Sequence, residues 1–593
     1  MDLFKPNSSS RKLPAVTALL LLVMAVLAAC GDNTATTAPA STTAAATTAA
    51  ATSAATTAAA VTTAAGLTPS AASTTAATGT TAPAGATTAA AGSGAANPGM
   101  GTEPTVAAAG KTGGTLKYGL SSDPSGLDPQ IHTGAAPAII KTLVYDTLLR
   151  LAADGKPLPW LATGWESPDP KNYTFHLRSG VKWHDGSDFT ADDVKFSFER
   201  IGKKETGATR YPDFSNIASI ATPDPLTVQV TLKQADASFL AVLADVTSSI
   251  VSKKFVEGGG DLKTKMMGTG AFTFVSRESG VKIELKKNPN FWIKGQPYLD
   301  GISFIMYPDD RARLSALQSG AVDFADYIPW RSYDEIGNGG QFVMYSKPAT
   351  DSAVFFNTTK PPFDNVKLRQ AVAMAIDPAA IAKAVFFGHA VPLTAGFLVP
   401  GTSYAEGQTM PYSFDTAKAK ALVQEAGYNG QEIELVTTST YDFLQQSAEI
   451  IQNELSAIGL KVKITSVDFT VFGQKFNAKE FNMLTSSFSA AIPDPNYMNQ
   501  LFAKGSLYQN RTGFADTKMD DLLSKGRSAA TEADRLPIYR ELNQYALTQL
   551  PIIPIVLREE GEAGASYVKN YVRYGSGVYV ETNRSLLTVW MDK

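Results

Sequence analysis

Residues 113–593 combine two hydrophobic periodicities, one typical of strands and one typical of helices. Apolar and polar residues alternate over 173–177, as in a half-buried strand. Apolar residues recur at three- and four-residue spacings over 139–151, which predicts a helix. Residues 190–194 have the composition of a helix N-cap followed by acids in the first turn.

The same two patterns recur further along the chain. We expect additional strands at 114–120, 226–232, 270–275, 281–286, 433–436 and 461–467, and additional helices at 366–376, 416–425 and 441–457. Strands and helices that alternate on this scale predict an α/β protein with several lobes.

The first 30 residues have the order of an export signal. Arg11 and Lys12 precede an apolar run at 19–27, which is shorter than the roughly 20 residues needed to cross a bilayer. Leu27-Ala28-Ala29-Cys30 resembles the bacterial lipobox, and Cys30 is the only cysteine of the 593 residues. We therefore expect residues 1–29 to be a lipoprotein signal peptide and Cys30 to carry a lipid anchor. The alternative is an ordinary secretory signal with an incidental cysteine.

Residues 30–112 differ from the rest of the chain in composition. They consist almost entirely of Thr, Ala, Ser, Gly and Pro, with few charges and no aromatic residue. Such a segment has little to bury against the entropy of ordering, so we expect a disordered tether between anchor and domain.

The remaining residues, about 480, exceed a single hydrophobic core, which predicts two or three lobes. The chain has 52 basic and 55 acidic residues, a net charge of -3. It therefore lacks the excess of positive charge that is typical of nucleic-acid-binding proteins. None of the four histidines, at 132, 176, 184 and 389, forms a pair at metal-ligand spacing. We expect no metal and no cofactor.

The sequence also lacks the common catalytic motifs. It has no Gly-x-Ser-x-Gly elbow, no His-Glu-x-x-His and no phosphate-binding Gly-x-x-x-x-Gly-Lys loop. A surface-tethered hydrolase remains an alternative, because a catalytic pair of carboxylates has no local signature. We expect a protein that is not an enzyme.

Several segments, in a fixed order, carry a resemblance to a known family. They include Trp183-His184-Asp185-Gly186, Phe189-Thr190-Ala191-Asp192-Asp193-Val194 and Asn288-Pro289-Asn290-Phe291-Trp292, with others at 158–162, 173–182, 268–272, 317–323, 356–363 and 369–377. Together they resemble the family 5 extracellular solute-binding proteins, which include the oligopeptide-, dipeptide- and nickel-binding proteins of ABC importers. The resemblance spans essentially all of residues 113–593.

The resemblance implies a periplasmic-binding-protein-like type II fold, with two hinged mixed-sheet lobes, a smaller extra domain and a ligand cleft between lobes. By analogy, lobe I combines 113–155, 269–350 and 561–593, lobe II takes 156–268, and lobe III takes 351–560. The implied protein is a monomer that captures a peptide or other small solute and delivers it to the permease subunits of an ABC importer. A ligand sensor is an alternative with the same fold.

The resemblance also places the ligand site. In peptide-binding members, the segment matching 486–497 carries an aspartate that pairs with the ligand ammonium, and here Ala491 stands in its place. A buried ammonium without a partner is costly, so free peptide N-termini are disfavoured unless another acid substitutes, Asp494 being one candidate. Peptides, oligosaccharides and other neutral solutes all remain possible ligands. The expected ligand-binding residues are Thr133, Gly134, Ala135, Ser487, Phe488, Ser489, Ala490, Ala491 and Asp494.

Overall fold

The computed structural model describes residues 110–131, 135–490, 492–575 and 579–593, with the backbone alone at 135, 136 and 579. The predicted signal peptide, Cys30 and most of the predicted tether lie outside these ranges. Within them, no helix combines the length and the apolar character needed to cross a bilayer.

One large mixed sheet dominates the described residues. Its strands follow the order β15-β14-β16-β12-β17-β11-β1-β10-β9-β8, and β13 pairs with β17 off this path. The bounds are β1 Thr115–Leu120, β8 Phe272–Glu278, β9 Lys282–Lys287, β10 Gly301–Met306, β11 Phe324–Ala325, β12 Phe342–Phe356, β13 Ala390–Pro392, β14 Ile433–Thr438, β15 Val462–Val467, β16 Met483–Phe488 and β17 Ile552–Ala565.

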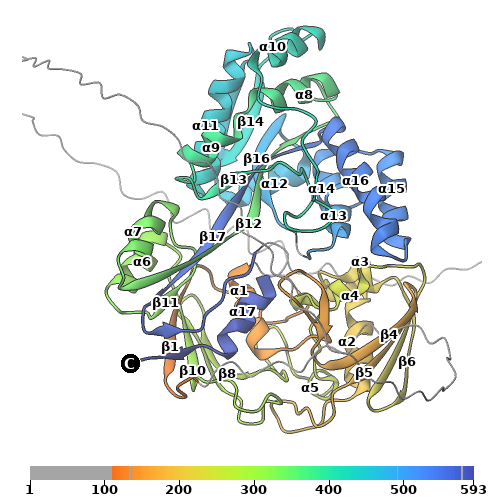
Figure 1. Cartoon of the computed structure of the whole chain (residues 1–593), viewed down its shortest axis with the longest axis vertical. Helices are drawn as coiled ribbons and strands as arrows, with labels where there is room; N and C mark the ends of the chain where they lie inside the picture. Colours follow the sequence, from red (N-terminus) through yellow and green to blue (C-terminus); the bar gives the residue numbers. More distant parts are fainter. Residues whose placement is uncertain (1–109, 132–134, 491, 576–578) are drawn as a thin grey trace, which may run out of the picture. The chain divides into compact units, whose positions relative to one another are not determined.

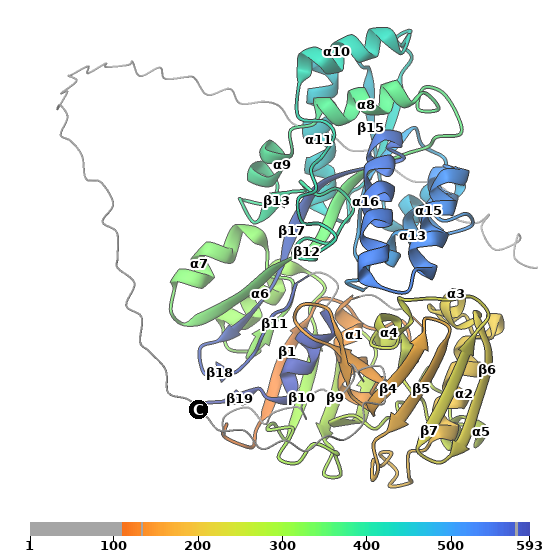
Figure 2. The ribbon, with the colours of Figure 1, turned by 45° about the vertical axis from the view of Figure 1, so that its right-hand side comes forward.

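A second sheet has the order β4-β5-β7-β6, and two short hairpins pair β2 with β3 and β18 with β19. The bounds are β2 Leu149–Leu151, β3 Pro157–Pro159, β4 Ala162–Asp169, β5 Asn172–Leu177, β6 Ile217–Asp224, β7 Thr227–Leu232, β18 Val568–Lys569 and β19 Trp590–Met591. Figure 2 shows this sheet with α2 (Ala191–Ile201) packed against it. The backbone N–H of Thr190 donates to Asp193 at 3.0 Å, so the predicted N-cap is present.

Helices cover the large sheet around β12, β14 and β16 (Figure 1). The bounds of these and the other α-helices are α1 Ala135–Val144, α3 Tyr211–Phe214, α4 Phe239–Val242, α5 Lys253–Glu257, α6 Asp310–Gln318, α7 Tyr333–Asn338, α8 Val366–Ala375, α9 Pro378–Ala384, α10 Thr416–Glu425, α11 Asp442–Ala457, α12 Phe469–Ala478, α13 Met498–Phe502, α14 Leu507–Thr512, α15 Thr517–Ser528, α16 Glu532–Gln549 and α17 Tyr579–Arg584.

Two long antiparallel strands, β12 and β17, hold the large sheet together. The first half of β12 pairs only with β17, whereas its second half, from Asp351 onward, also pairs with β16. On its other side, β17 pairs with β11 near Gly564 and with β13 near Leu557. Both strands therefore take part in both halves of the sheet, as Figure 1 shows.

The helix predicted over 139–151 is wrong in its extent. Helix α1 ends at Val144, whose carbonyl accepts a hydrogen bond from the backbone N–H of Gly270 at 3.0 Å. The following residues reach β2, which pairs with β3. Between them, the Asp146 carboxylate accepts a hydrogen bond from the Trp160 indole at 2.7 Å. These tertiary partners outweigh the helical periodicity.

Candidate ligand-binding site

Parallel strands β14, β15 and β16 end at a common edge of the large sheet. Helices α11 and α12 begin beyond β14 and β15, and residues 489–494, here called the edge loop, follow β16. In open α/β sheets, ligands bind outside the carboxyl ends of the strands. This edge is therefore the place where the fold supports a ligand site.

A set of polar side chains links the edge loop to β12 and β17. The hydroxyl of Ser489 lies 3.2 Å from that of Thr350, which donates to Oε1 of Glu560 at 2.6 Å. Glu560 also faces the guanidinium groups of Arg558 at 3.2 Å and Arg573 at 3.3 Å. We call these five residues the buried charge cluster.

The charge state of Glu560 follows from its two arginines. Burial alone would raise the pKa of its carboxyl, but Arg558, Arg573 and the Thr350 hydrogen bond outweigh burial and hold the pKa below its ordinary value. Glu560 is therefore ionised at neutral pH, and it orients both guanidinium groups.

Next to the buried charge cluster, several polar atoms have no partner. Ser352 and Ser487 lie opposite each other in β12 and β16, and neither buried hydroxyl forms a hydrogen bond with any other part of the described chain. Nε of Arg558 is also buried and unpartnered within those residues. Leaving a buried polar group unpaired costs about 1–3 kcal/mol, so native structures rarely tolerate it without a reason. Ligand recognition is such a reason.

The side chain of Arg558 is held in place by aromatic rings. Its guanidinium carbon lies 4.9 Å from the Phe443 ring centroid and 5.5 Å from that of Trp330. The residue is only 7% exposed. Stacking on two rings fixes a planar cation at the sheet edge, a geometry suited to an anionic group of a ligand.

Asp494 is engaged by a neighbouring helix. Its two carboxylate oxygens accept hydrogen bonds of 2.7 and 2.6 Å from Arg535 in α16. It also accepts a hydrogen bond of 2.8 Å from the backbone N–H of Asn496, where a short 3-10 helix begins. Both partners fix the backbone at the end of the edge loop.

Phe488 and Ala490 are both buried at 3% exposure. The Phe488 ring packs against Phe355 and Phe397, with centroid separations of 6.4 and 6.1 Å. Phe488 at the end of β16 and Ala490 of the edge loop are therefore buried among apolar residues, while Ser489 between them makes polar contacts.

Of the predicted site residues, Thr133, Gly134 and Ala491 lie outside the described residues, and only the backbone of Ala135 is described, at the start of α1. The structure brings Ser487 and Ser489 together with the buried charge cluster, which the sequence reasoning missed. The run of charges over 558–562, inside an otherwise apolar segment, is the signal that would have pointed to it.

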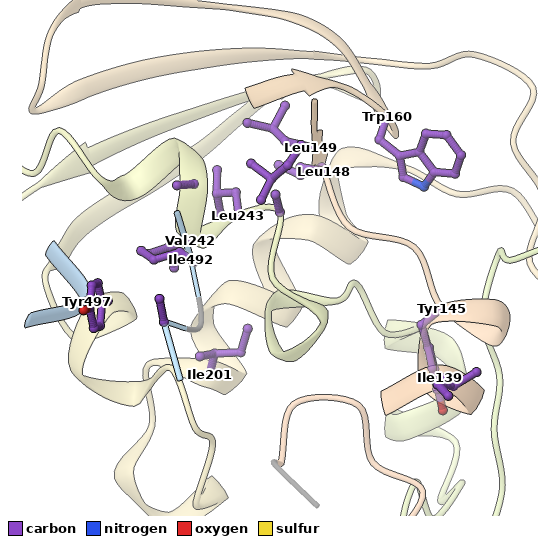
Figure 3. Close-up of a cluster of buried hydrophobic side chains, with 14 of the residues drawn as sticks. Ile139, Tyr145, Leu148, Leu149, Trp160, Ile201, Val242, Leu243, Ile492 and Tyr497 are labelled. Atoms are coloured by element: carbon purple, nitrogen blue, oxygen red, sulfur yellow. The ribbon is translucent and has the colours of Figure 1, made fainter. Parts of the chain in front are cut away.

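The edge loop also contacts the helices beside the four-stranded sheet. Figure 3 shows Ile492 next to Val242 and Leu243, and all three belong to one buried hydrophobic cluster. Just beyond the loop, the Asn496 amide donates to the Ser238 hydroxyl at 2.6 Å. The candidate site is therefore bounded by the large sheet on one side and the α4 region on the other.

The candidate site thus lies between the large mixed sheet and a second part of the protein that contains α4. This arrangement is typical of solute-binding proteins with the type II periplasmic-binding-protein fold. The family model of the bacterial extracellular solute-binding proteins, family 5, matches residues 156–510. The chain belongs to this family, whose members serve ABC importers.

Individual relatives agree with this assignment. The chain is 29% identical to the glutathione-binding protein GsiB of Salmonella typhimurium over 478 residues, which cover 78% of this chain and 91% of GsiB. The solved structure of AgaA from A. tumefaciens with agropinic acid is 32% identical, with a TM-score of 0.72 over 81% of this chain and 99% of AgaA. The DppA protein of Helicobacter pylori with the peptide STSA is 28% identical, with a TM-score of 0.72 over 82% and 99% of the two chains.

Proposed function

We propose that this protein is the lipid-anchored receptor of an ABC importer for a peptide or another amino-acid-derived solute that carries a carboxylate. The observation that carries the proposal is Arg558, a buried cation with an unpartnered Nε beside the unpartnered hydroxyls of Ser352 and Ser487. Together they offer a guanidinium and two hydroxyl donors to one acceptor group, which is the set that a carboxylate requires.

The ligands named for the relatives support this class. Glutathione, the peptide STSA and agropinic acid all carry carboxyl groups. Glu560 neutralises part of the charge of Arg558, so the site remains stable without ligand and still presents donors to an incoming anion.

The proposal also covers location and partners. Cys30 would hold the protein at the extracytoplasmic face of the cell membrane, and the Thr/Ala-rich tether over 30–112 would let a monomeric domain reach the permease subunits. The same proposal includes the boundaries of lobes I, II and III that we expect from the sequence.

Calorimetric titration with short peptides and glutathione tests the ligand class. We expect Arg558→Gln to weaken binding at least about tenfold and Arg558→Lys to restore only part of it, because lysine lacks the planar fork. Arg331→Gln removes an arginine whose side chain is 42% exposed and should have no effect. Unchanged affinity in a folded Arg558→Gln protein would refute the proposal.

A neutral solute such as an oligosaccharide is a second candidate, supported by two exposed aromatic rings at the same edge. Tyr441 is 44% and Phe469 49% exposed, and their ring centroids lie 5.2 Å apart. Exposed rings suit the apolar face of a sugar. Mass spectrometry of the ligand that co-purifies with the protein distinguishes the two classes, and turnover of that ligand by the purified protein would favour the hydrolase alternative instead.

A further inference from the structure

Two exposed aromatic residues, Tyr441 and Phe469, stand where α11 and α12 begin, beyond the carboxyl ends of β14 and β15. They are 44% and 49% exposed, and their rings meet edge to face with centroids 5.2 Å apart. A single exposed apolar side chain is common on a protein surface, but two exposed rings in contact form a continuous apolar surface that is costly to hydrate. We call Tyr441 and Phe469 the edge aromatic pair.

The edge aromatic pair is supported by buried rings. Phe469 stacks on Phe472, three residues further along α12, with a centroid separation of 5.9 Å and an interplanar angle of 13°. Phe472 is 3% exposed and lies 6.1 Å from the ring of Phe476, which is 2% exposed. Rings that are held in place lose little conformational entropy when a ligand binds, so this surface is preorganised for contact.

The start of α11 is not optimised for helix stability. Tyr441 occupies the N-cap position, and its side chain forms no capping hydrogen bond. Helix α12 has the favoured arrangement, in which Asp468 accepts hydrogen bonds from the backbone N–H groups of Thr470 and Val471 at 2.9 and 3.1 Å. A tyrosine in place of a capping residue departs from local preference, and such departures are typical of functional sites.

Ring contacts connect the edge aromatic pair to Arg558. The Phe443 ring lies 6.1 Å from that of Tyr441 and 4.9 Å from the guanidinium carbon of Arg558. Arg558 pairs with Thr350, and Val354 lies four residues further along β12, so the two β12 side chains share one face of the sheet. Val354 belongs to the buried cluster against which Phe443 packs. Arg558, Phe443 and Tyr441 therefore follow one another on the α11 side of the sheet.

We infer that the edge aromatic pair is the subsite for an aromatic side chain of the ligand, whose carboxylate faces Arg558. This rests on the proposed function and makes the solute a short peptide, or a related amino-acid derivative, with an aromatic group. An extended peptide advances by about 3.3–3.6 Å per residue, so about two or three residues span the two ring contacts between Arg558 and Tyr441.

The connection to Arg558 distinguishes this ligand from a sugar. A neutral sugar also stacks on exposed aromatic rings, but it has no group that requires a buried guanidinium. A solute with both a carboxylate and an aromatic ring uses both features of the edge at once.

The experiment titrates the protein calorimetrically with Ala-Ala-Ala, Phe-Ala-Ala, Ala-Phe-Ala and Ala-Ala-Phe. For wild-type protein, at least one phenylalanine peptide should bind at least about tenfold more tightly than Ala-Ala-Ala. Phe469→Ala and Tyr441→Ser should each lose most of this preference and bind Ala-Ala-Ala as the wild type does. Arg558→Gln should weaken all four peptides by a similar factor.

Matched variants separate this role from a structural one. Tyr441→Ser supplies a better N-cap and should raise the melting temperature, so unfolding would not explain its loss of preference. Tyr441→Phe retains the ring and should retain the preference. Phe414→Ala removes a ring that is also 49% exposed but lies before α10, and it should leave all four affinities unchanged.

The outcomes are distinguishable. If wild-type protein binds the four peptides equally, or if Phe469→Ala keeps the preference, the aromatic subsite is overturned while the proposed ligand class stands. If wild type binds none of the four, the proposed ligand class fails, and the subsite fails with it. Binding of maltotriose that both ring variants lose, without binding of any peptide, would assign the pair to a neutral sugar and overturn both.

Discussion

Asp494 and Arg535 form a two-pronged ion pair between the edge loop and helix α16, with donor–acceptor distances of 2.7 and 2.6 Å. The two side chains are 13% and 7% exposed, so the pair is largely shielded from water. It fixes the end of the loop that carries Ser489 into the candidate site.

Asp494→Asn should therefore destabilise the protein, because it leaves Arg535 as a buried cation without its counter-charge. We expect a loss of about 3 kcal/mol in the free energy of unfolding, measured by denaturant titration. Asp154→Asn breaks an exposed pair with Lys156 and should cost less than about 1 kcal/mol. Equal losses for the two variants would contradict this account.

The stability of the protein should fall as pH rises through neutrality, partly because of Glu562. Burial raises the pKa of this carboxyl to about 7, although Arg573 opposes the shift. The folded state then holds a proton that the unfolded state has released, so the stabilising contribution is full below the unfolded pKa of about 4.5 and is lost as pH rises to about 7.

Glu562→Gln should flatten that part of the stability profile, since the amide has no proton to lose. Urea unfolding from about pH 4 to about pH 8 measures the slope. Asp326, whose pKa burial raises to about 6, should leave a residual slope of the same sign. A variant with the wild-type slope would show that Glu562 does not titrate in this range.

Arg527 of α15 should control the lifetime of the ligand complex. It donates to the Asp236 carboxylate at 2.8 and 2.5 Å, and its carbonyl accepts a hydrogen bond of 3.0 Å from the backbone N–H of Ala237. These contacts join α15 to the segment before α4, on the far side of the candidate site. Loss of the ion pair leaves Asp236, whose side chain is 1% exposed, without a cation.

Arg527→Met should therefore weaken ligand affinity by about threefold to tenfold, mainly through faster dissociation, because it removes an ion pair that joins the two sides of the candidate site. Stopped-flow dissociation rates test this. Lys525→Met, an exposed position in the same helix, is the control. If the ligand dissociates from the two variants at the same rate, the ion pair does not contribute to the lifetime of the complex.

Cys30→Ser should abolish membrane attachment in the native host. The serine variant cannot be acylated, so we expect the precursor or a released form in the aqueous phase of a detergent partition. Wild-type protein should be found in the detergent phase. If the variant still enters the detergent phase, Cys30 is not the anchor.

Elements with strong local signals could be predicted from the sequence. Helix α10 occupies the expected range 416–425, and its N-cap Asp415 accepts a hydrogen bond from the backbone N–H of Lys418. Strands β5, β7 and β15 lie within one residue of their predicted limits, because their apolar residues have the expected spacing.

Elements that depend on distant partners could not be predicted from the sequence. Strand β17 is buried along most of its length, yet it contains Arg558, Glu560 and Glu562. Charged residues in a short segment argue against a buried strand when the sequence is considered without its distant partners. Their burial is compensated by Arg573 and Thr350 from other parts of the chain. For the same reason, the sequence indicated Ser487 and Ser489 but not the cluster that they approach.

The position of β17 determines the order in which the fold can be completed. In the large sheet, β17 lies between β12 and β11, although the 16 strands from β1 to β16, within residues 115–488, all precede it along the chain. A ribosome releases residues 115–488 before residues 552–565, so β15-β14-β16-β12 and β11-β1-β10-β9-β8 remain two unconnected sheets until then. Because this central strand is synthesised late, the chain stays incompletely folded for most of its translation. Passage through a secretion channel requires such an incompletely folded chain.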